Sequence, residues 1–186
     1  MADELDPRIP PVLGEMCDAR GYQGMERKGL VDHAGTCLIG TCSQGRVMVL
    51  YSDLTAAAGK LCTGDLMGLV RIFLEHGVDI GIVVFGEATL NAMQAARLQH
   101  RVKVEMIRDA DVTVNPTKHC LVPAHEALRA DEVADLVKRG IVIKKMAVLP
   151  RGDAIARFHA WTPGTVVRIH RGTKARADLP FYRVVR

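Results

Sequence analysis

The residues that could support catalysis are an aspartate and a Lys/Glu pair. Asp79 directly precedes an apolar run at residues 80–85, and Lys103 and Glu105 lie two positions apart further on. An acidic residue before a buried strand, with a nearby Glu-x-Lys pair, can hold a divalent ion beside a phosphodiester. Here the pair is reversed, and residues two apart on a strand share a face, so an exposed ion pair contributing under about 1 kcal/mol is the simpler expectation. A diverged metal-dependent nuclease therefore stays only an alternative.

The histidines and cysteines offer a second possible chemistry, metal binding. His119 and Cys120 are adjacent and His125 follows, but a zinc site there would need more ligands than the local sequence supplies. We instead expect His125 to be a loop residue that orders the chain by hydrogen bonding. The five cysteines show neither paired zinc spacing nor a secreted disulfide framework, so reduced intracellular thiols are expected. Phosphate-loop, hydrolase-elbow and dinucleotide motifs are also missing, and we expect no catalytic residue, metal or cofactor.

Charge is distributed unevenly along the chain. The 186 residues carry a formal net charge of +4, with 12 basic and 15 acidic residues before Leu121 and 13 and 6 after it. The C-terminal third is therefore drawn to an acidic protein surface or to nucleic acid, by an attraction that salt weakens. Phe158 and Trp161 could stack on bases, although the aromatic content of 4% favours core positions for both. Residues 80–85, the longest apolar run, are too few to cross a bilayer, so no membrane partner is expected.

The elements that must position these residues begin with an α/β domain. After a lead-in at residues 1–11, helical and strand periodicities alternate as far as residue 115. The apolar run at residues 80–85 has no polar face and directly follows a helical pattern, which predicts a central strand in a βαβ-type layer. The predicted elements are helices at residues 12–17, 66–74 and 88–99, a hairpin at 36–51, and strands at 80–85 and 102–106. In the third helix we expect Leu90, Met93 and Leu98 to point inward.

A second, smaller domain follows a break at Asn115-Pro116, because proline biases the preceding residue toward extended geometry. We place the jaw-like α/β domain at residues 12–118 and an α+β domain at 119–186. The second domain is predicted to contain helices near residues 133–137 and 153–160 and strands at 166–170 and 181–185, with a polar loop at 172–176. A module of roughly 65 residues is marginally stable alone, so docking on a partner would stabilise it.

Five segments of this second domain resemble a known family. They are Leu121-Val122-Pro123-Ala124-His125, Leu149-Pro150-Arg151, Ala156-Arg157-Phe158, Gly164-Thr165-Val166-Val167-Arg168-Ile169 and Phe181-Tyr182-Arg183-Val184-Val185. In this order and spacing they look like the C-terminal assembly domain of the fifth subunit of eukaryotic RNA polymerases, whose archaeal counterparts consist of this module alone. Arg20-Gly21-Tyr22, after the first helix, is also similar to that family.

The resemblance implies a non-catalytic subunit of a DNA-dependent RNA polymerase. In such a subunit the C-terminal domain docks on the largest polymerase subunit, among other subunits, and the N-terminal jaw-like domain lies near downstream double-stranded DNA. Location in the nucleus follows for a cellular protein, and nucleus, viral factory or virion for a homologue encoded by a large DNA virus. A free-standing DNA-binding adaptor is the main non-enzymatic alternative.

The resemblance also implies two sets of site residues. Those expected to support docking are Pro123, His125, Arg157, Gly164, Val166, Val167, Arg168, Tyr182 and Arg183. Those expected near DNA are Gly86, Ala88, Thr89, Arg97 and Arg101. The first three of the second set form the turn at the start of the third helix, where backbone N–H groups could face a phosphate.

Overall fold

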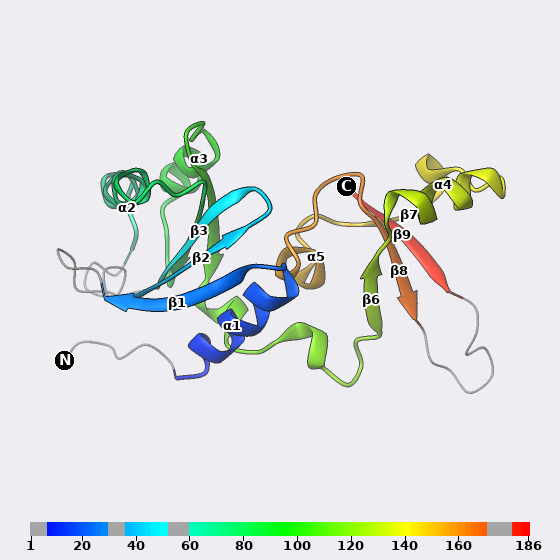
Figure 1. Ribbon diagram of the computed structural model, residues 1–186, viewed down its shortest axis with the longest axis horizontal. Coiled ribbons are helices and arrows are strands. Elements are labelled where there is room, and N and C mark those ends of the chain that lie inside the picture. Colours follow the sequence, from blue (N-terminus) through cyan, green and yellow to red (C-terminus); the bar gives the residue numbers. More distant parts are fainter. Residues whose placement is uncertain (1–6, 30–35, 52–59, 171–179) are drawn as a thin grey trace. The chain divides into compact units, whose positions relative to one another are not determined.

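The structure is a computed structural model that describes residues 7–29, 36–51, 60–170 and 180–186. The chain divides into two compact units, Met1–Val114 and Asn115–Arg186. Each unit has its own sheet and helices (Figure 1), which confirms the predicted combination of an α/β part and a smaller α+β part. Residues 1–6 of the expected lead-in and the polar loop at 172–176 lie outside the described residues.

Within the described residues, the N-terminal unit contains a mixed sheet in the order β1-β2-β3-β4-β5. The first three strands pair antiparallel, whereas β3, β4 and β5 run parallel and are connected through α2 and α3. Parallel neighbours require such helical crossovers, so the βαβ prediction is confirmed. The elements are α1 (Ile9–Ala19), β1 (Gln23–Gly29), β2 (Thr36–Cys42), β3 (Gly45–Tyr51), α2 (Thr63–Glu75), β4 (Ile80–Phe85), α3 (Leu90–Arg97), β5 (Lys103–Arg108) and η1 (Asp109–Val112).

The centre of this unit is β4, whose six residues are all buried. On one face of the sheet, α2 packs Leu69 and Phe73 against Met48 and Val83. A Cβ at Gly81 would collide with the ring of Phe73, so this glycine lets the helix approach the strand closely. The helical pattern predicted α2 correctly, and the uninterrupted apolar run predicted the central strand correctly.

The opposite face of the sheet is covered by α1. This helix buries Ile9, Val12, Leu13, Met16 and Cys17 along one side, as helical spacing predicts. It begins at Ile9 rather than after residue 11, because prolines are accommodated in the first helical turn, where their missing N–H groups would have had no partner. Figure 1 shows α1 on the side of the sheet away from α2 and α3.

The expectation for α3 was wrong for Leu90 and Leu98, whereas Met93 is half-buried. Leu90 and Leu98 are 77% and 67% exposed, while Ala92 and Ala96 are buried. Small residues on the inner face let α3 lie close to β5 and α2, and the larger leucines then fit only on the outside. Helical spacing alone does not distinguish the two faces when both carry apolar residues.

The C-terminal unit contains a second mixed sheet in the order β6-β8-β9-β7. The pairs β6–β8 and β8–β9 are antiparallel, and β9–β7 is parallel. Leu149, Val167 and Val185 pack with Ala156 of α5 on one face, and the partly buried Trp161 joins them. The elements are η2 (Pro116–Lys118), β6 (Ala124–Ala127), α4 (Ala130–Lys138), η3 (Ile143–Lys145), β7 (Ala147–Leu149), α5 (Ala154–Phe158), β8 (Val166–His170) and β9 (Phe181–Val185).

Candidate functional site

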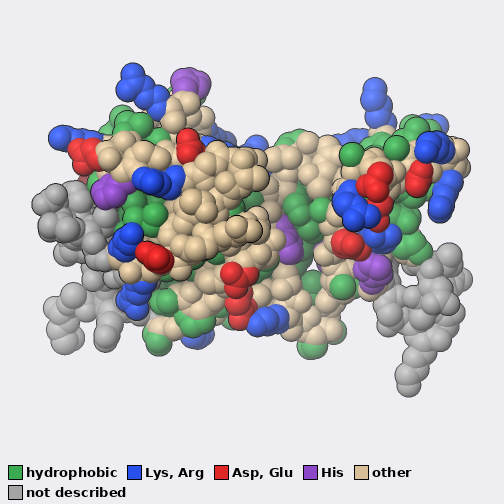
Figure 2. Space-filling model, in the orientation of Figure 1, with side chains coloured by type: hydrophobic (Ala, Val, Ile, Leu, Met, Phe, Trp, Pro, Cys, Tyr) green, Lys and Arg blue, Asp and Glu red, His purple; other side chains and the backbone are tan. Residues whose placement is uncertain are grey.

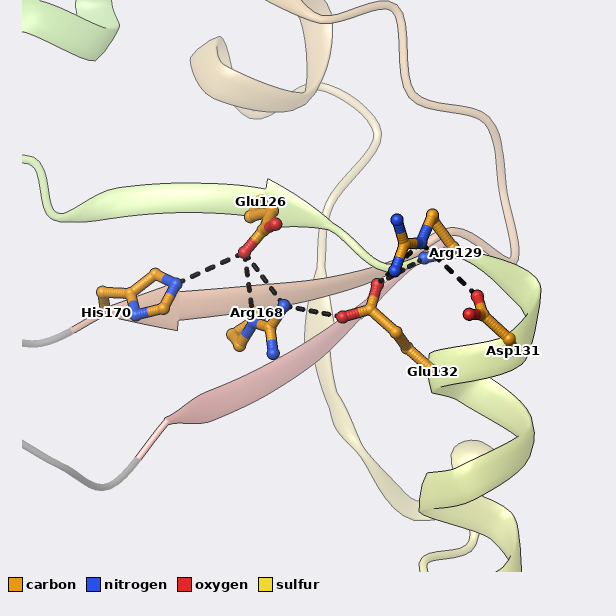
Figure 3. Close-up of polar contacts among 6 residues, drawn as sticks. All are labelled: Glu126, Arg129, Asp131, Glu132, Arg168 and His170. Atoms are coloured by element: carbon orange, nitrogen blue, oxygen red, sulfur yellow. Dashed lines mark hydrogen bonds and ion pairs between the residues drawn. The ribbon is translucent and has the colours of Figure 1, made fainter.

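A row of polar side chains crosses the C-terminal sheet. In the strand register, Glu126 of β6 lies opposite Arg168 of β8, which lies opposite Tyr182 of β9. The Arg168 guanidinium reaches the Glu126 carboxylate at 3.0 Å and the Glu132 carboxylate of α4 at 2.8 Å (Figure 3). Arg168 therefore ties the first turn of α4 to β6 and β8.

The same cluster continues around the start of α4. The backbone N–H of Arg129 donates to Glu132 at 3.0 Å, while the Arg129 guanidinium lies 3.5 Å from Asp131. The Arg129 hydrogen bond, helped by Arg168, holds the pKa of Glu132 below its usual range. Burial of Arg168 opposes its charge, but the hydrogen bonds and charges of Glu132 and Glu126 together outweigh burial and raise the pKa of the guanidinium. Figure 2 shows side chains of both signs gathered together on this unit, so the cluster is largely neutralised from within.

Four of the residues expected to support docking act through the backbone or the core. His125 lies in β6 rather than in a loop, and its Nδ1 lies 2.6 Å from the Pro123 carbonyl oxygen, where the ring N–H donates. Val166 and Val167 of β8 are fully covered within the unit. They can influence a partner only by holding β8 in place.

The remaining docking candidates are spread over three elements. Gly164 precedes β8 with φ of +94°, a conformation that L side chains rarely adopt. Arg157 lies half-buried in α5, and Tyr182 and Arg183 are half-buried in β9. The Nη1 of Arg183 donates to the Val148 carbonyl at 3.2 Å, and its guanidinium lies over the Phe181 ring. Successive strand residues face opposite ways, so Tyr182 and Arg183 cannot belong to one flat surface.

The turn expected near DNA is held by the segment before α2. The N–H of Leu61 donates to the Glu87 carbonyl at 2.8 Å, and the N–H of Thr89 donates to the Leu61 carbonyl at 3.0 Å. The Thr89 hydroxyl accepts the N–H of Ala92 and so caps α3. Gly86 is exposed and Ala88 half-buried beside this cap. The turn is thus rigid, although the exposed carboxylate of Glu87 would oppose a phosphate.

The two arginines expected near DNA are exposed at the other end of α3. Arg97 occupies its last turn, and Arg101 lies between α3 and β5. A cation in the last turn also interacts favourably with the helix dipole. Both guanidinium groups are therefore placed where water, phosphate or a protein carboxylate can reach them.

The residues that could have formed a nuclease site have structural partners instead. The carboxylate of Asp79 accepts the N–H of Arg46 at 2.8 Å, which joins the start of β4 to β3. Glu105 does not pair with Lys103 as expected but with Arg20, which lies 85 positions away. Across the described parts of the chain, no group of three or more His, Cys, Asp or Glu side chains could hold a metal ion.

The Arg20–Glu105 pair is the most buried charge interaction that the sequence prediction missed. Two guanidinium nitrogens of Arg20 donate to the two Glu105 oxygens, each at 2.9 Å. The Arg20 side chain is 2% exposed and that of Glu105 27%. Burial opposes the charge of Arg20, but Glu105 and, to a lesser extent, Tyr22 together outweigh burial and raise the pKa of the guanidinium. This fork joins the end of α1 to β5; the Arg20-Gly21-Tyr22 resemblance was the only local signal for it.

Comparison with known proteins decides the family. The profile described as RNA polymerase Rpb5, C-terminal domain, matches residues 114–185, nearly the whole C-terminal unit. DNA-directed RNA polymerase subunit Rpo5 of Metallosphaera sedula is 31% identical over 80 residues, which cover 42% of this chain and 96% of that protein. The chain belongs to the Rpb5/Rpo5 family of RNA polymerase subunits.

Eukaryotic members of the family match beyond the C-terminal unit. DNA-directed RNA polymerase V subunit 5A of Arabidopsis thaliana is 32% identical over 140 residues, or 74% of this chain and 58% of that protein. The subunit named for polymerases I, II and III in Caenorhabditis elegans is 33% identical over 108 residues, or 56% of this chain and 50% of that protein. The chain thus spans about half the length of these eukaryotic relatives. Of the helices that the structure describes, none is long and apolar enough to cross a membrane.

Proposed function

We propose that this chain is a non-catalytic subunit of a multisubunit DNA-dependent RNA polymerase and that its C-terminal unit docks on the largest subunit. The observation that carries the proposal is the coincidence of two boundaries. The family match covers residues 114–185, and the compact C-terminal unit spans Asn115–Arg186. A unit with its own sheet and core, matched almost from end to end, can serve as an independent attachment module.

In this proposal, docking on the largest subunit depends on both the backbone conformation and the surface side chains of the C-terminal unit. Gly164 sets the backbone entering β8, and Val166 and Val167 anchor that strand in the core. His125, Arg157, Tyr182 and Arg183 then offer half-buried polar groups that a partner could cover. Arg168 is already neutralised by two carboxylates, so its role in docking is to fix β6 and α4 rather than to supply charge.

Copurification with the polymerase tests the docking proposal. Gly164→Val forces a β-branched residue into positive φ, and Tyr182→Asp places a charge within β9. We expect each variant to lose the largest subunit from a tagged pull-down followed by mass spectrometry. Ala134→Asp, on the exposed side of α4, adds the same charge as a control and should copurify normally. Normal recovery of polymerase with both test variants would refute the proposal.

We further propose that the N-terminal unit lies near downstream duplex DNA. The rigid turn at Gly86, Ala88 and Thr89 and the exposed Arg97 and Arg101 are the groups that would face phosphates. Each phosphate contact contributes about 0.9 to the logarithmic salt slope of duplex binding. Changing both arginines to alanine should therefore flatten the slope of polymerase–DNA binding by roughly 1.8, while Arg71→Ala should leave it unchanged. An unchanged slope in the double variant would exclude these arginines as phosphate contacts.

Location in the nucleus follows from this proposal for a eukaryotic protein. The two alternative functions make different predictions. A free-standing DNA-binding adaptor would be recovered without polymerase subunits. A nuclease would show magnesium-dependent activity that Asp79→Asn abolishes, whereas we expect Asp79→Asn to loosen the β3–β4 connection through the lost Arg46 contact.

A further inference from the structure

The outer edge of the C-terminal sheet at β7 carries an excess of positive charge. No Asp or Glu occurs from residue 136 to 152, a stretch that contains five Lys or Arg residues; the neighbouring β9 adds Arg183 at its centre, and Arg186 directly follows it. Lys138 pairs with Asp135 at 3.1 Å. For the other six, no carboxylate of the described residues lies within ion-pair distance; they are Arg139, Lys144, Lys145, Arg151, Arg183 and Arg186.

Hydrogen bonds gather these cations around the three residues of β7. The guanidinium of Arg186 donates to the Lys144 carbonyl, and the N–H of Arg151 donates to the Arg186 carbonyl. The guanidinium of Arg183 donates to the carbonyl of Val148, in the centre of β7. The residues of η3, of the turn after β7 and of the β9 end that carry these charges therefore lie next to one short strand, and the Arg183 guanidinium contacts it directly.

β7 is also the last strand in the sheet order, with β9 as its neighbour on one side. The carbonyl of Leu149 accepts the N–H of Arg186, and bonding residues alternate along a parallel strand, so the N–H of Val148 faces outward. The side chain of Val148 is 41% exposed, and that of Val142, which directly precedes η3, is 52% exposed. An outward N–H, exposed aliphatic side chains and a cluster of positively charged residues thus occur together at the β7 edge.

The opposite edge of the same sheet lacks this combination. There, Arg168 and Arg129 are matched by Glu126, Asp131 and Glu132. Exposed cations on an edge strand normally discourage pairing with other strands. The exception is a strand of opposite charge, for which the same cations favour the encounter.

We propose that the β7 edge binds an extended, acidic polypeptide segment that contains aliphatic residues and adds to the sheet as a further strand. Strand addition uses main-chain hydrogen bonds for affinity and alternate side chains for specificity. The cations select acidic side chains, and Val142 and Val148 select aliphatic ones. Nucleic acid fits less well because phosphates would leave the valines and the outward N–H unused. This surface lies apart from the Glu126–Arg168–Tyr182 row, and the inference does not require the polymerase assignment.

The experiment uses the full chain and three labelled probes: a short Glu-Val repeat peptide, polyglutamate of equal length, and a short DNA duplex. Fluorescence anisotropy should show tightest binding of the Glu-Val peptide, weakening with salt. Lys144→Glu combined with Lys145→Glu should weaken that binding about tenfold. Both lysines are exposed, so the fold is not at risk. Arg27→Glu combined with Lys60→Glu makes the same change of net charge on exposed residues elsewhere and should alter affinity less than about twofold.

A second variant separates strand addition from simple charge attraction. Val148→Pro removes the outward N–H, while the β7 residues that pair with β9 keep their N–H groups. This variant should weaken binding of the Glu-Val peptide and have little effect on binding of polyglutamate. Equal loss in the two charge-reversal variants would overturn the proposal in favour of nonspecific attraction. Equal or tighter binding of polyglutamate or DNA, lost on reversing Lys144 and Lys145, would also overturn it and identify a general polyanion surface.

Discussion

Breaking the Arg20–Glu105 fork should destabilise the N-terminal unit strongly and asymmetrically. Removing one partner of a buried ion pair costs about 3–5 kcal/mol, because the other charge stays buried without compensation. In Glu105→Leu the stranded group is a guanidinium whose side chain is 2% exposed, so we expect a loss of about 3 kcal/mol. In Arg20→Met the stranded carboxylate is 27% exposed and can be hydrated, which lowers the expected loss to about 1–2 kcal/mol.

The double variant Arg20→Met/Glu105→Leu provides the decisive comparison. Replacing a buried pair by apolar residues of similar volume is often neutral, so the double variant should lie within about 1 kcal/mol of the parent. The resulting coupling energy in the double-mutant cycle is about 3–5 kcal/mol. Glu75→Ala breaks the pair with Arg71, whose side chains are 82% and 56% exposed, and should cost below about 0.5 kcal/mol.

Urea unfolding can report the two units separately, because the single tryptophan, Trp161, belongs to the C-terminal unit. We expect the Arg20 and Glu105 variants to shift the far-ultraviolet circular dichroism transition of the N-terminal unit and to leave the tryptophan fluorescence transition in place. If the two single variants are additive in the double variant, or if Glu75→Ala costs as much as Glu105→Leu, the argument from burial is refuted.

Three further predictions concern single residues. Gly164→Ala should cost about 1–2 kcal/mol, seen as a shift of the tryptophan transition, because a Cβ there meets no atom but φ is +94°; an unchanged transition would contradict this. Burial raises the pKa of the Cys17 thiol from 9.0 to about 11, so between these pH values the thiol is ionised in the unfolded chain but neutral in the folded one. The free energy of unfolding should therefore fall by on the order of 2–3 kcal/mol as the pH rises from 9 to 11. Cys17→Ala should remove that fall. The Arg129 N–H holds the pKa of Glu132 below its usual value of about 4.3. The Glu132 carboxylate therefore contributes to the free energy of unfolding above that pH, and this contribution is lost as the pH falls below it. Glu132→Gln should therefore flatten the acid limb of a stability–pH curve, and an unaltered limb would exclude Glu132 as its source.

The parts of the fold that the sequence predicts are those whose periodicity is strong over a long stretch. The repeats in α2 and the unbroken apolar run of β4 each leave one reasonable assignment. By contrast, β1 contains two glycines and three charged residues, and β7 has three residues. Neither shows a strand pattern, because pairing with β2 and β9 rather than local preference makes each a strand.

The site residues divide in the same way. The core position of Phe158 and the partly buried position of Trp161 were predicted, whereas the positive φ of Gly164 was not. The Arg20–Glu105 fork joins residues far apart in the chain, and sequence spacing suggested Lys103 as the partner of Glu105 instead. Such pairs are decided by which elements the fold brings together, and no local pattern encodes them.

The place of β9 between β8 and β7 has a consequence for how the chain is synthesised. β7 and β8 share no ladder, so the second sheet cannot close until the segment Phe181–Val185 has left the ribosome. The N-terminal sheet is complete once β5 has emerged, more than seventy residues earlier. The N-terminal unit can therefore fold on a nascent chain whose C-terminal unit is still incomplete. Until Val185 emerges, Val167 and Leu149 lack one of the side chains that they pack against in the folded core.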